Sequence, residues 1–175
     1  QLDLAAIDET AIVGGRQLVT ASALLDLVSE RWLSALVKRC RAADAAVLFV
    51  LTYDGRMRCE PEEAGDDRIR QLVNQHQRTD KGFGVALGPD AADVAERLLA
   101  AAGYRVLRAP SDWVLVPESA ELQRQLIIGW AEAAAAVLPS EAGSITDWRQ
   151  RRLRHVGAGR SRLTVGHVDV AAWLA

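Results

Sequence analysis

The chain of 175 residues is long enough to bury a core, and half of its residues are apolar while a quarter are charged, as in globular proteins. Its net charge of −2 argues against binding of nucleic acid through the phosphate backbone. Cys40, Cys59 and the three histidines lack metal-ligand spacing, and no apolar run could span a membrane. With no secretory signal, we expect a reduced, cytoplasmic protein without a metal or a membrane partner.

Residues 17–36 are the stretch around which the rest of the chain is organised. An apolar run at residues 18–21 ends at Ser22 and predicts a buried strand of a parallel sheet. Apolar residues from Leu24 to Leu36 then recur with helical spacing, which predicts a helix packed on that sheet. Ligands of open α/β sheets sit at the carboxyl ends of strands, so residues 20–26 are expected to line a ligand crevice. The alternative is that Ser22 only caps the helix.

The next elements complete a parallel unit and then become irregular. Residues 45–52 form a continuous, partly β-branched apolar run, which predicts a second parallel strand joined to the first by the helix. Tyr53-Asp54-Gly55-Arg56 predicts a turn at the end of that strand, and the acidic residues 59–67 predict a surface loop. A helix over residues 68–77 follows. The polar segment 76–84, with two glycines around one aromatic residue, has a composition that is unusual for a plain connector.

The second half of the chain predicts helices and antiparallel strands. Gly88-Pro89-Asp90 begins a helix that should end at Gly103. Residues 104–108 and 113–116 are expected to pair as a hairpin. Helices over residues 119–138 and 141–155 come next, the latter with an arginine-rich face expected to be solvated, and alternation over residues 162–170 predicts a last strand. No linker interrupts this order, so residues 1–175 are expected to form a single domain.

Parallel strands first and antiparallel strands last resemble the C-terminal part of a class I S-adenosylmethionine-dependent methyltransferase, whose seven-stranded sheet ends in an antiparallel hairpin. The residues that carry the resemblance are Leu2-Asp3-Leu4, residues 17–26, residues 46–54 and Gly103-Tyr104-Arg105-Val106. They are similar to the family's third to sixth strands. The resemblance implies an α/β, Rossmann-like methyltransferase sheet whose N-terminal strands are missing, because the family's glycine-rich cofactor loop has no counterpart and Gly14-Gly15 is a poor substitute. We therefore expect a domain truncated at its N-terminus.

The resemblance also assigns site residues. It places Asp3 and Leu4 on the adenine side of the cofactor, and Thr20, Ala21, Ser22 and Asp26 near its sulfonium. It places Tyr53 and Asp54 toward the acceptor substrate, and His76, Lys81 and Phe83 in the substrate lid, with Tyr53 and His76 as the catalytic candidates. Plainer interpretations remain open: Tyr53 as a half-buried aromatic, His76 as a helix-end residue and Lys81 as a solvated charge.

Two functions follow as expectations. The first is transfer of a methyl group from S-adenosylmethionine to a small-molecule acceptor by the intact protein. The second is a cofactor-free, methyltransferase-like binding or scaffold module. In the family, the fourth strand lies beside the first, so residues 18–21 would become an open apolar edge here. We therefore expect a homodimer if the chain is complete as given.

Overall fold

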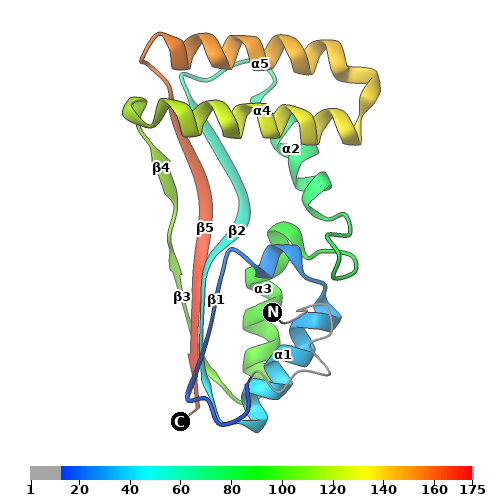
Figure 1. Ribbon diagram of the computed structural model, residues 1–175, viewed down its shortest axis with the longest axis vertical. Helices are drawn as coiled ribbons and strands as arrows, with labels where there is room; N and C mark the ends of the chain where they lie inside the picture. Colours follow the sequence, from blue (N-terminus) through cyan, green and yellow to red (C-terminus); the bar gives the residue numbers. More distant parts are fainter. Residues whose placement is uncertain (1–12, 175) are drawn as a thin grey trace. The chain divides into compact units, whose positions relative to one another are not determined.

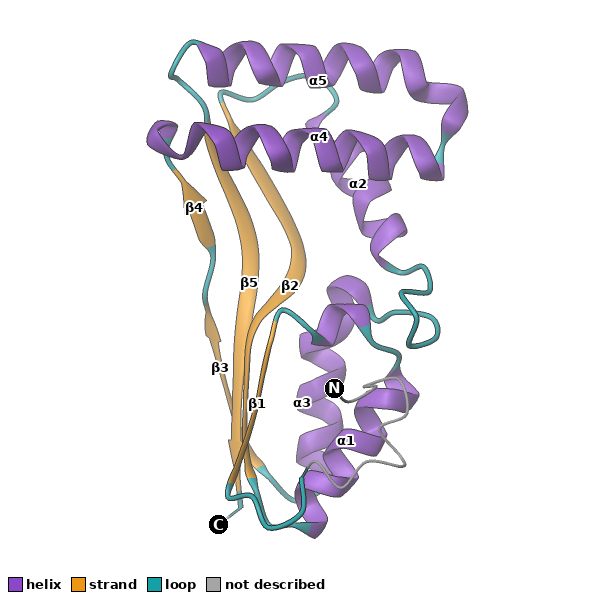
Figure 2. Cartoon of the chain, in the orientation of Figure 1, coloured by secondary structure: helices purple, strands orange, loops and turns teal. Residues whose placement is uncertain are grey.

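The computed structural model describes residues 13–174, which divide into two compact units (Figure 1). Unit 1 comprises residues 13–54, 77–111 and 167–174, and unit 2 comprises residues 55–76 and 112–166. Strands and helices occur in both, with parallel pairing early in the chain and antiparallel pairing at its end (Figure 2). The predicted α/β fold class is thereby confirmed. The single domain stays a prediction.

Unit 1 is built on the predicted strand–helix–strand segment. Strand β1 (Leu18–Ser22) pairs in parallel with β2 (Ala46–Glu60), so that Leu18 lies opposite Ala46 and Ser22 opposite Val50. Helix α1 (Glu30–Ala42) connects them. The strand order is β1-β2-β5-β3, with β5 (Arg162–Trp173) antiparallel to β3 (Arg105–Pro110). Among the described strands, β1 therefore lies at one edge of the sheet.

The two faces of this sheet differ in their covering. Helices α1 and α3 (Ala91–Ala101) pack side by side against one face (Figure 1). Their apolar side chains enclose Val47 and Phe49 of β2 and Val170 of β5 in the main core. Side chains alternate along a strand, so their neighbours point the other way. Four large apolar residues are consequently exposed: Leu18, Leu48, Leu107 and Trp173.

The helix after β1 begins later than predicted, so the interpretation of Ser22 as its cap is wrong. Ser22 ends β1, Ala23 has a left-handed φ of 49°, and a short 3-10 turn at Leu25–Leu27 follows. The cap is Ser29, whose hydroxyl accepts the Trp32 N–H at 3.3 Å. A serine with helical residues after it satisfies a free N–H of the first turn, and Ser29 does so at the start of the regular helix.

Strand β2 is longer than the apolar run that predicted it. The turn expected at residues 53–56 is wrong, because these residues continue the strand to Glu60. Positive φ angles at Leu51 (55°) and Gly55 (87°) are accommodated within the strand rather than reversing it. Cys59 is likewise buried in β2 rather than lying in a surface loop, and the loop starts at Pro61.

The predicted hairpin is also wrong. β3 and β4 (Trp113–Leu115) do not pair with each other; each pairs antiparallel with β5. Pro110 lies opposite Val168 and Trp113 opposite Val165, so β4 keeps the register that β3 has. Between them, the Ser111 N–H donates to the His167 carbonyl at 2.9 Å. The residues taken for a turn therefore continue along β5.

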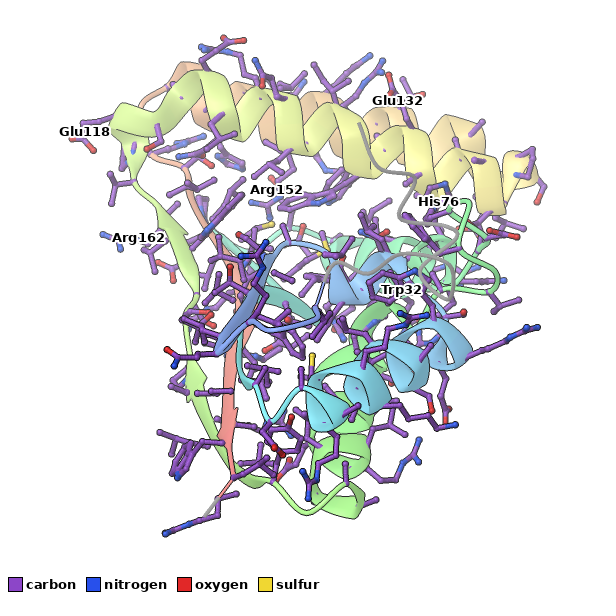
Figure 3. The ribbon with its side chains drawn as sticks, turned by 60° about the horizontal axis from the view of Figure 1, so that its bottom comes forward. Trp32, His76, Glu118, Glu132, Arg152 and Arg162 are labelled. Atoms are coloured by element: carbon purple, nitrogen blue, oxygen red, sulfur yellow. The ribbon has the colours of Figure 1, made fainter. Side chains whose placement is uncertain are left out.

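Unit 2 carries three helices: α2 (Asp66–Gln77), α4 (Ala120–Val137) and α5 (Ala142–Gly157). The lengths of α4 and α5 confirm the predicted helices, and the two pack side by side (Figure 1). The expected solvated arginine face is wrong at its centre. Arg152, which Figure 3 labels, is fully buried, and Trp148, which donates to the same Asp66 carboxylate, is only 2% exposed. In residues 13–174, no helix has both the length and the apolar character needed to cross a bilayer.

Candidate functional site

The polar residues of unit 1 that merit a functional interpretation lie where β1 ends and β2 continues alone. Parallel pairing ends where Ser22 meets Val50. The next residue, Leu51, has a left-handed φ, which costs a residue with a side chain roughly 1–2 kcal/mol. Its N–H donates to Asp169 Oδ1 at 2.8 Å, and the Ser111 hydroxyl donates to the same oxygen at 2.6 Å. Asp169 of β5 thus fixes the backbone of β2 where it leaves the parallel pair.

Tyr53 follows this bend and is buried. Its ring meets the His167 ring edge-on, with centroids 6.2 Å apart. The preceding residue, Thr52, is 1% exposed, and its hydroxyl has no hydrogen-bond partner among the described residues. A buried hydroxyl without a partner is costly, and such groups occur where a ligand or an ordered water completes the site.

Asp26 lies close enough to His167 for the charges of the two side chains to interact. It lies on the 3-10 turn after β1 and is 8% exposed. Burial raises the pKa of the Asp26 carboxyl, and its backbone hydrogen bond and the charge of His167 oppose that shift. A carboxylate, an imidazole and a phenol are therefore gathered at one edge of the sheet. We call them the Asp26–His167–Tyr53 group; together they can accept, hold or donate a proton.

Sequence reasoning selected Asp26 and Tyr53 but assigned no role to His167 or Asp169. Both lie on β5, two residues apart and thus on one face of the strand. A histidine and a carboxylate on an otherwise apolar face of β5 were the available signal. Their neighbours could not be inferred, because a pattern within β5 does not say which strands it joins.

The other predicted cofactor residues are divided between the two faces of β1. Ala21 is half-buried against the core, whereas Thr20 and Ser22 are exposed on the opposite face. Alternation thus keeps them from sharing one wall. Asp3 and Leu4 lie outside the described residues. Asp54 continues β2 beyond Tyr53 and is half-buried.

The segment predicted as a lid is folded on itself. Asp80 Oδ1 accepts the N–H groups of Gly82 and Gly84 at 2.7 and 3.1 Å. The Lys81 ammonium donates to the Thr79 hydroxyl at 2.9 Å. Phe83 packs edge-on against Trp32 of α1, with ring centroids 5.9 Å apart. Phe83 therefore anchors the segment to the core of unit 1.

His76 lies in the last turn of α2 and belongs to unit 2 (Figure 3). Tyr53, the other catalytic candidate, belongs to unit 1. The two catalytic candidates thus belong to different units. His167 is the imidazole that accompanies Tyr53.

S-adenosylmethionine fits the described residues only in part. Ser22, Asp26 and Thr52 offer hydroxyl and carboxylate groups near the carboxyl end of β1. Gly14 and Gly15 precede β1 and so lie at its amino end, where they cannot supply backbone N–H groups to the same ligand. The chain holds no G-x-G-x-G run elsewhere. Within residues 13–174, no group of His, Cys, Asp and Glu side chains could hold a metal ion.

No family model and no curated protein matches the sequence. Among solved structures, the chain is similar to phospholethanolamine N-methyltransferase 2 of Haemonchus contortus in complex with phosphomonomethylethanolamine and S-adenosylhomocysteine, with 13% identity, a TM-score of 0.31, and 90% of this chain and 33% of that chain covered. It is also similar to the cyclopropane synthase MmaA2 from Mycobacterium tuberculosis, with 10% identity, a TM-score of 0.37, and 95% and 64% of the two chains covered. The chain thus spans a third to just under two thirds of these structures.

Proposed function

We propose that this chain is part of a methyltransferase that uses S-adenosylmethionine and methylates a small-molecule acceptor. The observation that carries the proposal is the Asp26–His167–Tyr53 group beside the carboxyl end of the parallel pairing between β1 and β2. Open α/β sheets bind their ligands at that edge. The order of parallel and antiparallel strands agrees with the family resemblance seen in the sequence.

The residues have distinct roles in this proposal. The cofactor supplies an activated methyl group, so the protein mainly has to align the acceptor. Tyr53, held by the Asp169-anchored bend and by His167, orients the acceptor. Asp26 and His167 take the proton of an acceptor that must lose one. Asp54, His76, Lys81 and Phe83 remain proposed contacts on the acceptor side.

Calorimetric titration with S-adenosylhomocysteine tests the proposal. We expect the 175-residue chain to bind weakly or not at all, because the described residues fit only part of the cofactor. The protein expressed from the reading frame upstream of Gln1 should bind, and Ser22→Trp should abolish that binding by filling the crevice. Leu107→Trp is the matched control, because Leu107 is exposed on β3, two strands away from β2. Failure of the longer protein to bind would refute the proposal.

A cofactor-free binding or scaffold module is the second candidate function. The position of Gly14 and Gly15 at the amino end of β1 favours it, since it leaves no phosphate- or carboxylate-binding loop of glycines beside Ser22. The two functions differ in one property of the longer protein. A scaffold module would bind neither S-adenosylmethionine nor S-adenosylhomocysteine at any chain length.

A further inference from the structure

Unit 2 contains a cavity of about 470 Å³ with an unusual lining. Three of its six lining residues are arginines: Arg56 and Arg58 of β2 and Arg70 of α2, accompanied by Met57, Asp112 and Thr164. Arg56 and Arg58 are two residues apart on a strand, so they project from the same face. Arg70 approaches from a different element. The convergence thus depends on tertiary structure and not on one run of basic sequence.

The three arginines differ in how many hydrogen bonds they form with nearby carboxylates. Arg56 forms a two-point ion pair with Asp112, with bonds of 2.7 and 3.1 Å. Arg70 donates one N–H to Asp67 at 3.1 Å, and the Asp67 side chain is 88% exposed. Arg58 Nε lies 3.5 Å from Glu60, which is long for a hydrogen bond. A guanidinium has five N–H donors, so Arg58 and Arg70 keep most of theirs for a ligand.

The local charge contrasts with that of the whole chain. The protein carries a net charge of −2, yet the cavity lining carries three guanidiniums and one carboxylate. The Arg56 and Arg58 side chains are 57% and 69% exposed, so solvent screens part of the repulsion between these charges, and an anion in the cavity would offset the rest. Guanidinium forks match the oxygens of phosphate in pairs, and the Thr164 hydroxyl adds a neutral donor to the same lining.

We propose that this cavity binds a phosphate group, either as the free ion or as part of a phosphorylated small molecule. Arg58 and Arg70 provide the main contacts and Thr164 a further hydrogen bond. Asp112 tunes the site by occupying Arg56 and by lowering the positive charge of the lining. The site belongs to unit 2, uses none of the residues of the Asp26–His167–Tyr53 group, and stands whether or not the chain transfers methyl groups.

Titration of the 175-residue chain with inorganic phosphate, followed through the side-chain NMR signals of the arginines, tests the proposal. We expect saturable shifts of the Arg58 and Arg70 signals. Arg58→Ala and Arg70→Ala should each weaken binding about tenfold, the factor that corresponds to loss of a charge-assisted hydrogen bond. Asp112→Asn should tighten binding several-fold, because it removes the negative charge and releases the Arg56 fork.

The controls separate a site from general attraction between charges. Arg124→Ala removes an exposed arginine of α4 in the same unit and should leave the affinity unchanged. Equal weakening by Arg124→Ala, weaker binding by Asp112→Asn, or shifts that never saturate would each overturn the proposal. A second titration uses glycerol 3-phosphate in place of inorganic phosphate. Tighter binding than that of inorganic phosphate supports a phosphorylated small molecule as the ligand, and equal binding supports the free ion.

Discussion

Replacement of Asp66 by alanine should destabilise unit 2 more than any other single loss of a charge there. The Asp66 carboxylate begins α2 and accepts four hydrogen bonds: the Glu63 N–H at 2.9 Å, Trp148 Nε1 at 2.8 Å, and two from the Arg152 guanidinium. Arg152 also donates to the Pro61 carbonyl. The Arg152 side chain is 0% exposed, whereas the Asp66 side chain is 22% exposed.

This difference in burial determines how much unfolding free energy each substitution should cost. Asp66→Ala leaves a fully buried guanidinium without its counter-ion, which costs about 3–5 kcal/mol of unfolding free energy. Arg152→Met removes the charge and keeps the length of the side chain, while Asp66 keeps Trp148 and Glu63 as donors. We expect a smaller cost of about 1–2 kcal/mol. The double variant should cost roughly 2 kcal/mol less than the sum of the two, because it leaves no unpaired charge.

Urea unfolding followed by tryptophan fluorescence measures these differences. Asp67→Ala is the matched control, because it removes the adjacent carboxylate, whose side chain is 88% exposed. That change should stay within about 0.5 kcal/mol. A loss below about 1 kcal/mol for Asp66→Ala, or strict additivity in the double variant, would refute the reasoning about the buried guanidinium.

Four further predictions concern the rest of the chain. Burial raises the pKa of Asp26, so the folded state holds this proton more tightly than the unfolded state does, and stability falls as the pH rises from the unfolded pKa to the folded pKa. Asp26→Asn should therefore be more stable than the unchanged protein at neutral pH in urea titrations. This gain in stability should vanish below about pH 4, where the carboxyl is protonated in both states. Burial raises the pKa of Cys40 to about 11 and that of Cys59 to about 12, so neither should react with a disulfide reagent near neutral pH until the protein unfolds, and rapid labelling of the native protein would contradict this. Light scattering should find the 175-residue chain as a dimer that Leu18→Lys dissociates, because β1 is an apolar edge strand among the described residues. A stable monomer would contradict this prediction. Amides of residues 78–84 should exchange faster than those of α1 and α3, and equal protection would count against a lid.

The sequence predicted local structure well where one segment decides it. Helical spacing placed α4 and α5, and Gly103 with its positive φ follows α3 as expected. The errors arose where a distant segment decides the outcome. Asp54-Gly55 has the composition of a turn but stays in β2, and Ser111-Asp112 stays extended because β5 supplies its hydrogen bonds.

In the candidate site, too, the sequence predicted what one segment decides and missed what a distant segment decides. Residue types and their place after apolar strands selected Asp26 and Tyr53. His167 joins them only because β5 lies next to β2 in the sheet, and a strand order cannot be deduced from alternation within one strand. Arg152 was misjudged for a related reason: an arginine is buried only where a carboxylate such as Asp66 meets it, and that partner is 86 positions away.

The place of β5 in the sheet has a consequence for biosynthesis. β5 follows the other four described strands along the chain, yet it lies between β2 and β3 and also pairs with β4. Until it emerges, β3 and β4 have no strand partner, and their exposed residues Leu107, Trp113 and Val114 stand on open edges. A nascent chain stalled before Arg162 is therefore a substrate for chaperones and for aggregation, and the described sheet forms only after residues 162–173 have emerged.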